Sequence, residues 1–506
     1  MRSLASLLPL LAHRYGERTA LVTAGRSLTF RELDDLSARV ATGLAGRGWE
    51  HGARITLYAG NRWEWLVAYH GILKAGFVVN PLNVLLTADE VAYVVADAGV
   101  TAIIGAGDRL GAVRERCPQL DAVIAFDDPP PGCEAFDELL TDDGPAQPLG
   151  IEPAEIGAIA YTSGTTGHPK GAVQPSVAIV TNVVSTATMH GRQAGETMVT
   201  ALPLPHVYGN VAVHATLLTG GTVVLQPRFE AGEALELIER HDAQLFEGVP
   251  AMYAALLAHE DVGRRALKSL TRSTVGGQTM AIESMREWEE RTHAPLVELW
   301  GMTELAGLGT THPVVVPPVH GSIGVALPGV DVDVFDLDDP GRRLPPGEEG
   351  ELMVRGPIVM SGYWGREEAT REVLLPDGWL RTGDIAHRSA TNHLFVVDRR
   401  KDMILTAGYN VYPAEIERVL SAHPAVSMVA VGKRADDVKG ELAEAYVVLR
   451  PGQGAGADEL LAHCRAQLAA YKVPRAVHFV EELPTTSTGK IMRRRLAMSE
   501  PPTEPA

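Results

Sequence analysis

The chain has few cysteines, no excess of positive charge and no long apolar run. Cys117, Cys133 and Cys464 are its only cysteines, and no two of them form a CxxC pair. This argues against a disulfide framework or a structural zinc site and fits a reducing compartment, so we expect a cytoplasmic protein. No stretch approaches the roughly 18 apolar residues that are needed to cross a bilayer.

Basic residues are outnumbered, since 45 Lys and Arg stand against 63 Asp and Glu, which gives a net charge of −18. Such a chain repels nucleic acid and anionic membrane surfaces, so neither is an expected partner. The apolar share of 45% and the charged share of 21% are those of an ordinary soluble globular protein. At 506 residues, two or three domains are expected.

The N-terminal segment is apolar but short. Leu4, Leu8 and Leu11 share one face of a helix, and no A-x-A-like cleavage site follows them. We therefore expect a helix that packs on the core rather than a signal peptide.

Helix and strand patterns alternate through the first two-thirds of the chain. Residues 29–32 form a capping box for a helix that Gly48 can end, and residues 54–58 have the pattern of a strand. Asn61 is expected to cap a second helix that runs toward Lys74. This rhythm predicts α/β layers around a buried parallel sheet.

From about Gly321 the pattern changes to short strands and turns, which predicts a β-rich subdomain. After Asp398 a charged stretch leads into a compact α/β segment. The predicted fold class is therefore α/β. Layered α/β subdomains and a β-rich subdomain form a large N-terminal domain (1–398), and a small α+β domain follows (399–506).

The strongest chemical signal is a loop rich in glycine and hydroxyl residues that a lysine closes. It follows the apolar strand 156–160 and reads Tyr161-Thr162-Ser163-Gly164-Thr165-Thr166-Gly167-His168-Pro169-Lys170-Gly171. Glycines let backbone N–H groups turn toward an anion, hydroxyls donate further hydrogen bonds and the lysine adds charge, so the loop suits polyphosphate. It is not a Walker A loop, because Lys170 precedes a glycine rather than Ser or Thr.

Further motifs follow this loop in a fixed order. They are Gly276-Gly277-Gln278, Trp300-Gly301-Met302-Thr303-Glu304, Thr382-Gly383-Asp384, Asp398-Arg399-Arg400-Lys401-Asp402 and Pro484-Thr485-Thr486-Ser487-Thr488-Gly489-Lys490. Together they resemble the motifs of the acyl-CoA synthetase, non-ribosomal peptide adenylation and luciferase superfamily, called the adenylate-forming or ANL enzymes. The resemblance covers nearly the whole chain, and several motifs in order are more specific than any one of them.

The resemblance implies which residues contact the nucleotide: Thr162, Ser163, Gly164, Thr165, Thr166, Gly167, Lys170, Gly276, Gly277, Gln278, Trp300, Gly301, Asp384 and Arg399. Asp384 follows a tight turn, so its carboxylate could accept both ribose hydroxyls, and Arg399 could contact ribose or phosphate. Glu304 could hold Mg²⁺, because a hard cation prefers carboxylate oxygens. Thr303 could reach the α-phosphate.

Two further residues have expected catalytic roles. Lys490 could bridge the carboxylate and α-phosphate oxygens as negative charge shifts between them, which is a transition-state role. Residues 202–210 resemble the family's P-L-x-H segment, which implies that His206 lies beside the acyl site.

The resemblance also implies two half-reactions with ATP, Mg²⁺ and CoA. A carboxylate first attacks the α-phosphorus of ATP and expels pyrophosphate. The C-terminal domain, a mobile lid, then rotates about a hinge that Lys401 matches, and a face around Gly408 forms a tunnel for the incoming thiol.

Several positions depart from the commonest family pattern. Gln174-Pro175-Ser176 stands where a Thr-His pair is usual, and Ala407 replaces the first of two glycines beside Gly408. Trp300 and Gln278 would shorten or polarise the acid pocket, which argues against a very long chain. The segment 248–253 lacks the aspartate that holds an α-amino group in peptide synthetases, which favours a free acid.

The acceptor stays open at this point. CoA is the first expectation, with an aromatic or medium-size acid as substrate. The alternatives are a carrier-protein thiol, an amine, no transfer at all, or activation of nitrite for arylamine diazotisation. A catalytically inactive nucleotide-binding regulator would lack Lys490, Glu304 or Lys170, and all three are present. The sequence does not fix the oligomeric state, for which a homodimer is one arrangement.

Lys490→Ala is predicted to reduce adenylation far more than transfer from pre-made acyl-AMP, because Lys490 acts only in the first half-reaction. The two half-reactions are measured separately as pyrophosphate release and as thioester formation. Equal losses in both would contradict the domain-rotation role.

Overall fold

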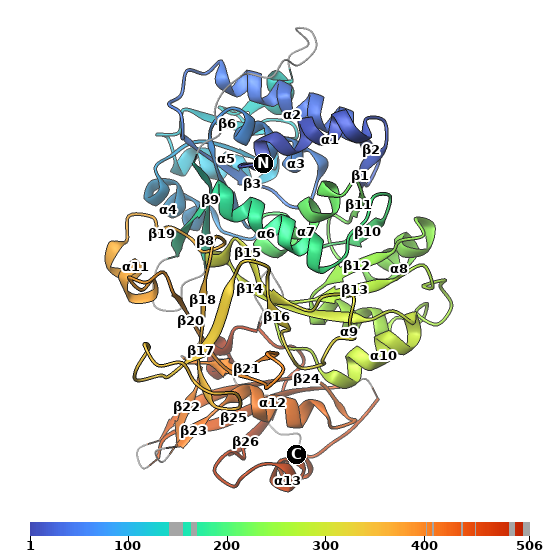
Figure 1. The fold of residues 1–506 in the computed structure, drawn as a ribbon, viewed down its shortest axis with the longest axis vertical. Coiled ribbons are helices and arrows are strands. Elements are labelled where there is room, and N and C mark those ends of the chain that lie inside the picture. Colours follow the sequence, from blue (N-terminus) through green and yellow to red (C-terminus); the bar gives the residue numbers. More distant parts are fainter. Residues whose placement is uncertain are drawn as a thin grey trace.

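A computed structural model gives the fold of the chain. It describes residues 1–140, 155–162, 169–400, 402–406, 409–436, 439–450, 452–484 and 491–498. Figure 1 shows the N-terminal elements at the top of the view and the C-terminal sheet at the bottom. Over these ranges no helix is both long enough and apolar enough to cross a membrane.

Nine strands of the described chain form one sheet with a parallel centre. Their order is β16-β15-β14-β13-β12-β10-β11-β1-β2, and the run from β14 to β1 is parallel. The bounds are β1 Thr19–Thr23, β2 Arg26–Thr29, β10 Thr197–Thr200, β11 Thr222–Leu225, β12 Leu245–Gly248, β13 Arg272–Val275, β14 Leu296–Met302, β15 Gly307–Thr311 and β16 Val325–Ala326.

Helices cover both faces of this sheet. They are α6 (Ser176–Met189), α7 (Val207–Leu218), α8 (Ala231–Arg240), α9 (Pro250–Ala258) and α10 (Ile282–Thr292). Phe246 of β12 packs in an apolar cluster with residues of α8, α9 and α10, whereas its neighbour Leu245 packs in the cluster that contains residues of α6 and α7. Because side chains two residues apart on a strand share a face, Glu247 faces α6 and α7 together with Leu245.

A second sheet of eight strands carries the stem of the predicted phosphate loop. Its order is β19-β9-β8-β4-β3-β5-β6-β7. The bounds are β3 Arg54–Tyr58, β4 Val78–Leu82, β5 Val100–Gly105, β6 Ala122–Ala125, β7 Glu134–Ala135, β8 Ile156–Thr162, β9 Lys170–Pro175 and β19 Gly362–Tyr363. The helices of this region are α1 Leu7–Tyr15, α2 Phe30–Ala45, α3 Trp63–Lys74, α4 Ala88–Ala98 and α5 Gly107–Arg116.

Two smaller sheets follow. The antiparallel sheet β17-β18-β20-β21 is built from Asp331–Phe335, Glu349–Arg355, Leu380–Arg388 and Leu394–Arg399, with α11 (Glu367–Val373) before β20. The C-terminal sheet contains β22 Ile404–Thr406, β23 Tyr409–Val411, β24 Val426–Asp436, β25 Gly440–Leu449 and β26 Ala476–Phe479, with helices α12 Pro413–Ser421 and α13 Ala457–Gln467.

The predicted fold class is confirmed, with layered α/β sheets, a β-rich part and a small C-terminal α+β part (Figure 1). The boundary predicted between residues 398 and 399 falls at the end of β21, and it stays a prediction, as does the mobility of the C-terminal part. Leu4, Leu8 and Leu11 are all buried, as expected of a segment packed on the core, but Leu4 lies in a 3-10 turn (Leu4–Ser6) that precedes α1.

Of the two helix starts predicted from the sequence, one is confirmed and one is wrong. The capping box of Thr29 and Glu32 is present, but helix α2 ends at Ala45 before Gly46 and not at Gly48. The cap predicted at Asn61 is wrong, because α3 begins after Arg62 without a side-chain cap.

Asn61 is instead buried in a tertiary contact. Its amide donates to the carbonyl oxygens of Leu202 and Gln226 at 3.0 Å each, and its Oδ1 accepts from the Leu204 N–H at 2.9 Å. Asn61 therefore holds the segment that leads to His206.

Candidate functional site

The stem of the predicted phosphate loop is a β-hairpin of β8 and β9. Thr162 at the end of β8 pairs with Lys170 at the start of β9. Ser163, Gly164, Thr165, Thr166 and Gly167 lie outside the described residues, so their predicted phosphate contacts stay predictions. The stem places the two ends of the loop side by side.

Polar contacts fix this stem to the surrounding helices. The Tyr161 hydroxyl donates to Asp97 Oδ2 at 2.6 Å, and Arg366 donates to Asp97 Oδ1 at 2.6 Å. Burial and the hydrogen bond to Asp97 both raise the pKa of Tyr161, so its hydroxyl stays a neutral donor. The loop therefore starts from a rigid base.

Glu304 lies in the short 3-10 turn Thr303–Leu305 that follows β14. Its Oε1 accepts from the Tyr363 hydroxyl at 2.8 Å, and the Nζ atom of Lys170 lies 5.3 Å from the centre of the Tyr363 ring. Burial raises the pKa of Glu304, whereas the hydrogen bond from Tyr363 favours the ionised carboxylate. Tyr363 thus joins the predicted metal ligand to the predicted phosphate-binding lysine.

Two side chains from other elements hold the backbone of this turn. Gln174 of β9 donates its Nε2–H to the carbonyl oxygen of Thr303 at 2.8 Å. Asn182 of α6 donates to the carbonyl oxygens of Leu305 and Leu308 at 3.0 and 2.7 Å. Gln174, which departs from the usual family pattern, therefore has a clear structural role beside Thr303.

Asp384 lies on β20 directly opposite Arg399 on β21. Its Oδ2 accepts from the Trp300 indole N–H at 2.8 Å, and its Oδ1 lies 3.2 Å from Arg399 Nε. Each carboxylate oxygen has two lone pairs, so Asp384 keeps acceptor capacity for a pair of hydroxyl groups. Because Trp300 lies on β14, the strand that leads into the Glu304 turn, this hydrogen bond ties the Asp384–Arg399 pair to that strand.

The glycine loop lies at the carboxyl end of β13. A Cβ atom on Gly276 would approach Leu299 Cδ1 to 2.2 Å, so a larger residue there would force the Leu299 side chain to move. Gly277 has φ of +89°, and a Cβ built on it would lie 3.6 Å from Val249 Cγ1. The structure therefore brings the loop 276–278 against the segment that follows β12.

His206 is the N-cap of α7, with its Nδ1 accepting from the Tyr208 N–H at 3.3 Å. This contact leaves the proton of the neutral ring on Nε2. Because α7 and the strands β12 and β13 all reach the same edge of the sheet, His206 lies at the carboxyl edge where ligands bind in α/β sheets.

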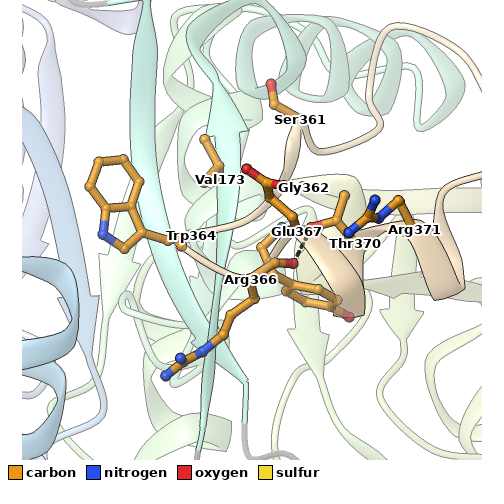
Figure 2. Close-up of a pocket in the computed structure, with 10 residues that line it drawn as sticks. Val173, Ser361, Gly362, Trp364, Arg366, Glu367, Thr370 and Arg371 are labelled. Atoms are coloured by element: carbon orange, nitrogen blue, oxygen red, sulfur yellow. Dashed lines mark hydrogen bonds between the residues drawn. The ribbon is translucent and has the colours of Figure 1, made fainter.

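A cavity of about 490 Å³ adjoins this region. Figure 2 shows that Val173 of β9 forms one wall and that residues 361–371 form the other. Tyr363 belongs to this lining, whereas Glu304, His206 and Asp384 do not.

Lys490, Lys401 and Gly408 lie outside the described residues, and their predicted roles stay predictions. Arg493, three residues after Lys490, donates to both carboxylate oxygens of Glu417 at 2.8 and 2.9 Å. Arg493 also donates to Asp402 at 3.3 Å, so this residue is held against the segment that follows β21.

The structure thus gathers most of the predicted residues that it describes. Thr303, Glu304, Trp300, Asp384 and Arg399 form one group, and Lys170 joins it through Tyr363. Gly276, Gly277, Gln278 and His206 form the adjoining edge, and Gly301 lies on β14 between the two. Tyr363, Gln174 and Asn182 were not predicted as site residues. The aromatic pair Tyr363-Trp364 after Gly362 is the local signal that could have drawn attention to Tyr363.

Comparisons with known proteins identify the family of the chain. The model of the AMP-binding enzyme family matches residues 11–364, and that of the AMP-binding enzyme C-terminal domain matches residues 415–490. The chain is 37% identical to a feruloyl-CoA synthase of Amycolatopsis sp over 478 residues, which cover 94% of each chain. It is 32% identical to the long-chain-fatty-acid–CoA ligase of Bacillus subtilis (strain 168) over 538 residues, which cover 99% of this chain and 95% of the relative.

A solved structure shares the fold over nearly the whole length. It is an anthranilate CoA ligase in complex with anthranoyl-AMP, with a TM-score of 0.90 and 27% identity, covering 98% of this chain and 97% of that chain. The predicted family is therefore confirmed, and the chain belongs to the AMP-binding enzyme family.

Proposed function

We propose that the protein is an ATP-dependent, AMP-forming acid:CoA ligase. In the first half-reaction an acid carboxylate oxygen attacks the α-phosphorus of ATP, and the bond from that phosphorus to pyrophosphate breaks. In the second the CoA sulfur attacks the acyl carbonyl, the bond to AMP breaks and the thiol proton is released. The observation that carries the proposal is the arrangement of Lys170 and Glu304 around Tyr363, with the ion pair of Asp384 and Arg399 held by Trp300 of β14, the strand that leads to Glu304.

Different residues of the site bind different parts of the nucleotide. Asp384 accepts from the ribose hydroxyls, and Arg399 holds the orientation of the Asp384 carboxylate by its ion pair. Lys170 places positive charge at the start of the phosphate loop, where it attracts the phosphates. This arrangement positions the α-phosphate near Thr303 before the acid attacks.

Glu304 would hold Mg²⁺. One buried carboxylate beside the phosphate loop suits this ion, which usually binds through one or two carboxylates together with substrate phosphates and water. When bound, the ion neutralises phosphate charge and favours the departure of pyrophosphate. Glu304 must be ionised for this role, and the hydrogen bond from Tyr363 supports that state.

CoA is the proposed acceptor because both curated relatives compared above are CoA ligases. An amine is the second candidate acceptor, because the solved structure of the amide bond synthetase McbA from Marinactinospora thermotolerans is 30% identical to this chain with a TM-score of 0.88. We further propose an aromatic or other compact acid, since the feruloyl-CoA synthase and the anthranilate CoA ligase act on aryl acids. Three residue roles stay predictions: the adenylating lysine at Lys490, the hinge at Lys401 and the thiol tunnel at Gly408. A homodimer and a cytoplasmic location also stay predictions.

The proposal is tested with the pure enzyme, ATP, Mg²⁺ and a panel of aliphatic and aromatic acids, with and without CoA. We expect pyrophosphate release that depends on an acid, together with a thioester identified by mass when CoA is added. Release that ignores CoA but requires an amine or nitrite would overturn the proposed acceptor and leave adenylation in place.

Asp384→Ala is predicted to lower kcat/KM for ATP by about 10- to 100-fold, because hydrogen bonds to a charged group are lost. The measurement is pyrophosphate release at varied ATP with the best acid at saturation. Asp331→Ala, which removes an exposed aspartate paired with Arg355, is the matched control and should leave this constant unchanged. Unchanged ATP dependence in Asp384→Ala would remove Asp384 from the site.

Tyr363→Phe is predicted to move the acidic limb of the pH profile of kcat/KM for ATP to higher pH. The hydroxyl lowers the pKa of Glu304, so its removal raises that pKa further, and the ionised carboxylate then forms only at higher pH. Higher Mg²⁺ concentration should partly restore activity at low pH. A limb that stays in place would show that Glu304 does not control it.

A further inference from the structure

The face of the nine-stranded sheet that α6 and α7 cover is polar directly below the candidate site. Thr200 of β10, Glu247 of β12 and Thr274 of β13 are in register with one another, so they form one row on this face. The chain leaves this row into the three loops of the site, residues 201–206, 248–250 and 276–278. The row is therefore the floor beneath those loops.

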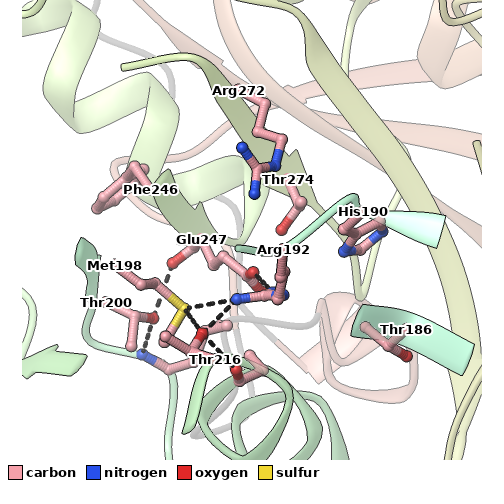
Figure 3. A network of polar contacts seen from close by, with 12 residues as sticks. Thr186, His190, Arg192, Met198, Thr200, Thr216, Phe246, Glu247, Arg272 and Thr274 are labelled. Atoms are coloured by element: carbon pink, nitrogen blue, oxygen red, sulfur yellow. Dashed lines mark hydrogen bonds and ion pairs between the residues drawn. The ribbon is translucent and has the colours of Figure 1, made fainter. Parts of the chain in front are cut away.

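Arg192, which follows α6, completes this floor. Its guanidinium donates to Glu247 and to Thr216 of α7, and it lies 3.5 Å from the Met198 sulfur. The side chains of Arg192 and Glu247 are each only 1% exposed. Figure 3 shows Arg192 at the centre of the network with Glu247 and Thr216 beside it. We call Arg192 and Glu247 the buried pair.

Tyr208 connects the buried pair to the site. It lies on the first turn of α7, two residues after His206, and its hydroxyl is 2.7 Å from Thr274 Oγ1. Burial raises the pKa of Tyr208, so its hydroxyl stays protonated. Through Thr274, the strand neighbour of Glu247, Tyr208 therefore links the start of α7, where His206 lies, to the row that holds the buried pair.

The space around the buried pair is filled by side chains. Arg272 beside it binds Glu196 at 2.7 Å, and His190 Nε2 lies 2.9 Å from Thr311 Oγ1. Within the described residues, Arg192 Nε and His190 Nδ1 are buried with no hydrogen-bond partner. An alkyl chain placed there would displace packed polar groups and offer them no hydrogen bonds, which is unfavourable in a dry interior.

From this arrangement we propose that the buried Arg192–Glu247 pair closes the far end of the acid pocket and sets the length of the acid. Acids whose tail ends at Tyr208, such as aryl acids and short alkyl acids, are accepted, and long-chain acids are excluded. The inference rests on the proposed acid activation and assigns two specificity-determining residues to it.

The first test needs no variant. Pyrophosphate release is measured for the native enzyme with cinnamate, butyrate, octanoate, dodecanoate and palmitate. We expect kcat/KM to fall steeply between octanoate and palmitate and to be high for cinnamate. Equal values for cinnamate and palmitate would overturn the inference while the proposed function stands.

The second test removes both charges together with Arg192→Leu and Glu247→Ala in one chain. Single variants are avoided, because removal of one partner leaves an uncompensated buried charge. The ratio of kcat/KM for dodecanoate to that for cinnamate should rise about 10-fold or more, since each methylene that finds an apolar place contributes on that scale. An unchanged ratio in a folded, active double variant would overturn the inference.

A matched control uses a partly buried pair away from the site. Lys74 of α3 and Asp34 of α2 lie 2.5 Å apart, with side-chain exposures of 10% and 22%. The double variant Lys74→Met and Asp34→Leu should keep the native chain-length profile. A changed profile in this control would show that general loosening of the structure, and not loss of the buried pair, changes the length of acid accepted.

No pyrophosphate release by the native enzyme with any acid would overturn the proposed function and this inference with it.

Discussion

The candidate site depends on how residues 360–364 join two sheets. The N–H groups of Ser361 and Trp364 donate to the carbonyl oxygens of Val173 and Gly171 on β9, at 2.9 and 2.8 Å. The N–H of Met360 donates to the carbonyl oxygen of Glu304 at 2.8 Å, and the Tyr363 hydroxyl reaches the Glu304 carboxylate.

Because β9 belongs to the eight-stranded sheet and Glu304 follows a strand of the nine-stranded sheet, this short segment fixes one relative to the other. The stem of the phosphate loop and the Glu304 carboxylate are therefore in place before a nucleotide binds. Preorganisation of this kind removes the cost of rearranging charged groups during the reaction.

The layered fold and most of the candidate site residues could be predicted from the sequence, because short local patterns indicate them. The alternation of helices and strands predicted the α/β layers, and the capping box at Thr29 and Glu32 predicted the start of α2. The order of the motifs placed Asp384 and Arg399 in one functional group. The structure adds that they face each other across the hairpin of β20 and β21, a register that the two motifs alone do not give.

Other features depend on contacts between distant segments, which no local pattern records. Asn61 has the sequence context of a helix cap, yet its amide is committed to Leu202 and Leu204, more than a hundred residues away. Trp300 was expected to shorten or polarise the acid pocket, but its indole N–H is committed to Asp384. Arg192 and Glu247 belong to no motif, and only the packing of α6 and α7 on the sheet brings them together.

The buried pair also limits how the family can diversify from this chain. Loss of one partner leaves a lone charge in the interior, at a cost of about 3–5 kcal/mol, against a total stability of about 5–15 kcal/mol for a typical domain. A lineage that lengthens its acid by this route must therefore change two codons nearly at once or first acquire stabilising substitutions elsewhere. In the proposed assignment, an evolutionary barrier therefore stands between short and long acids, in addition to the shape of a pocket.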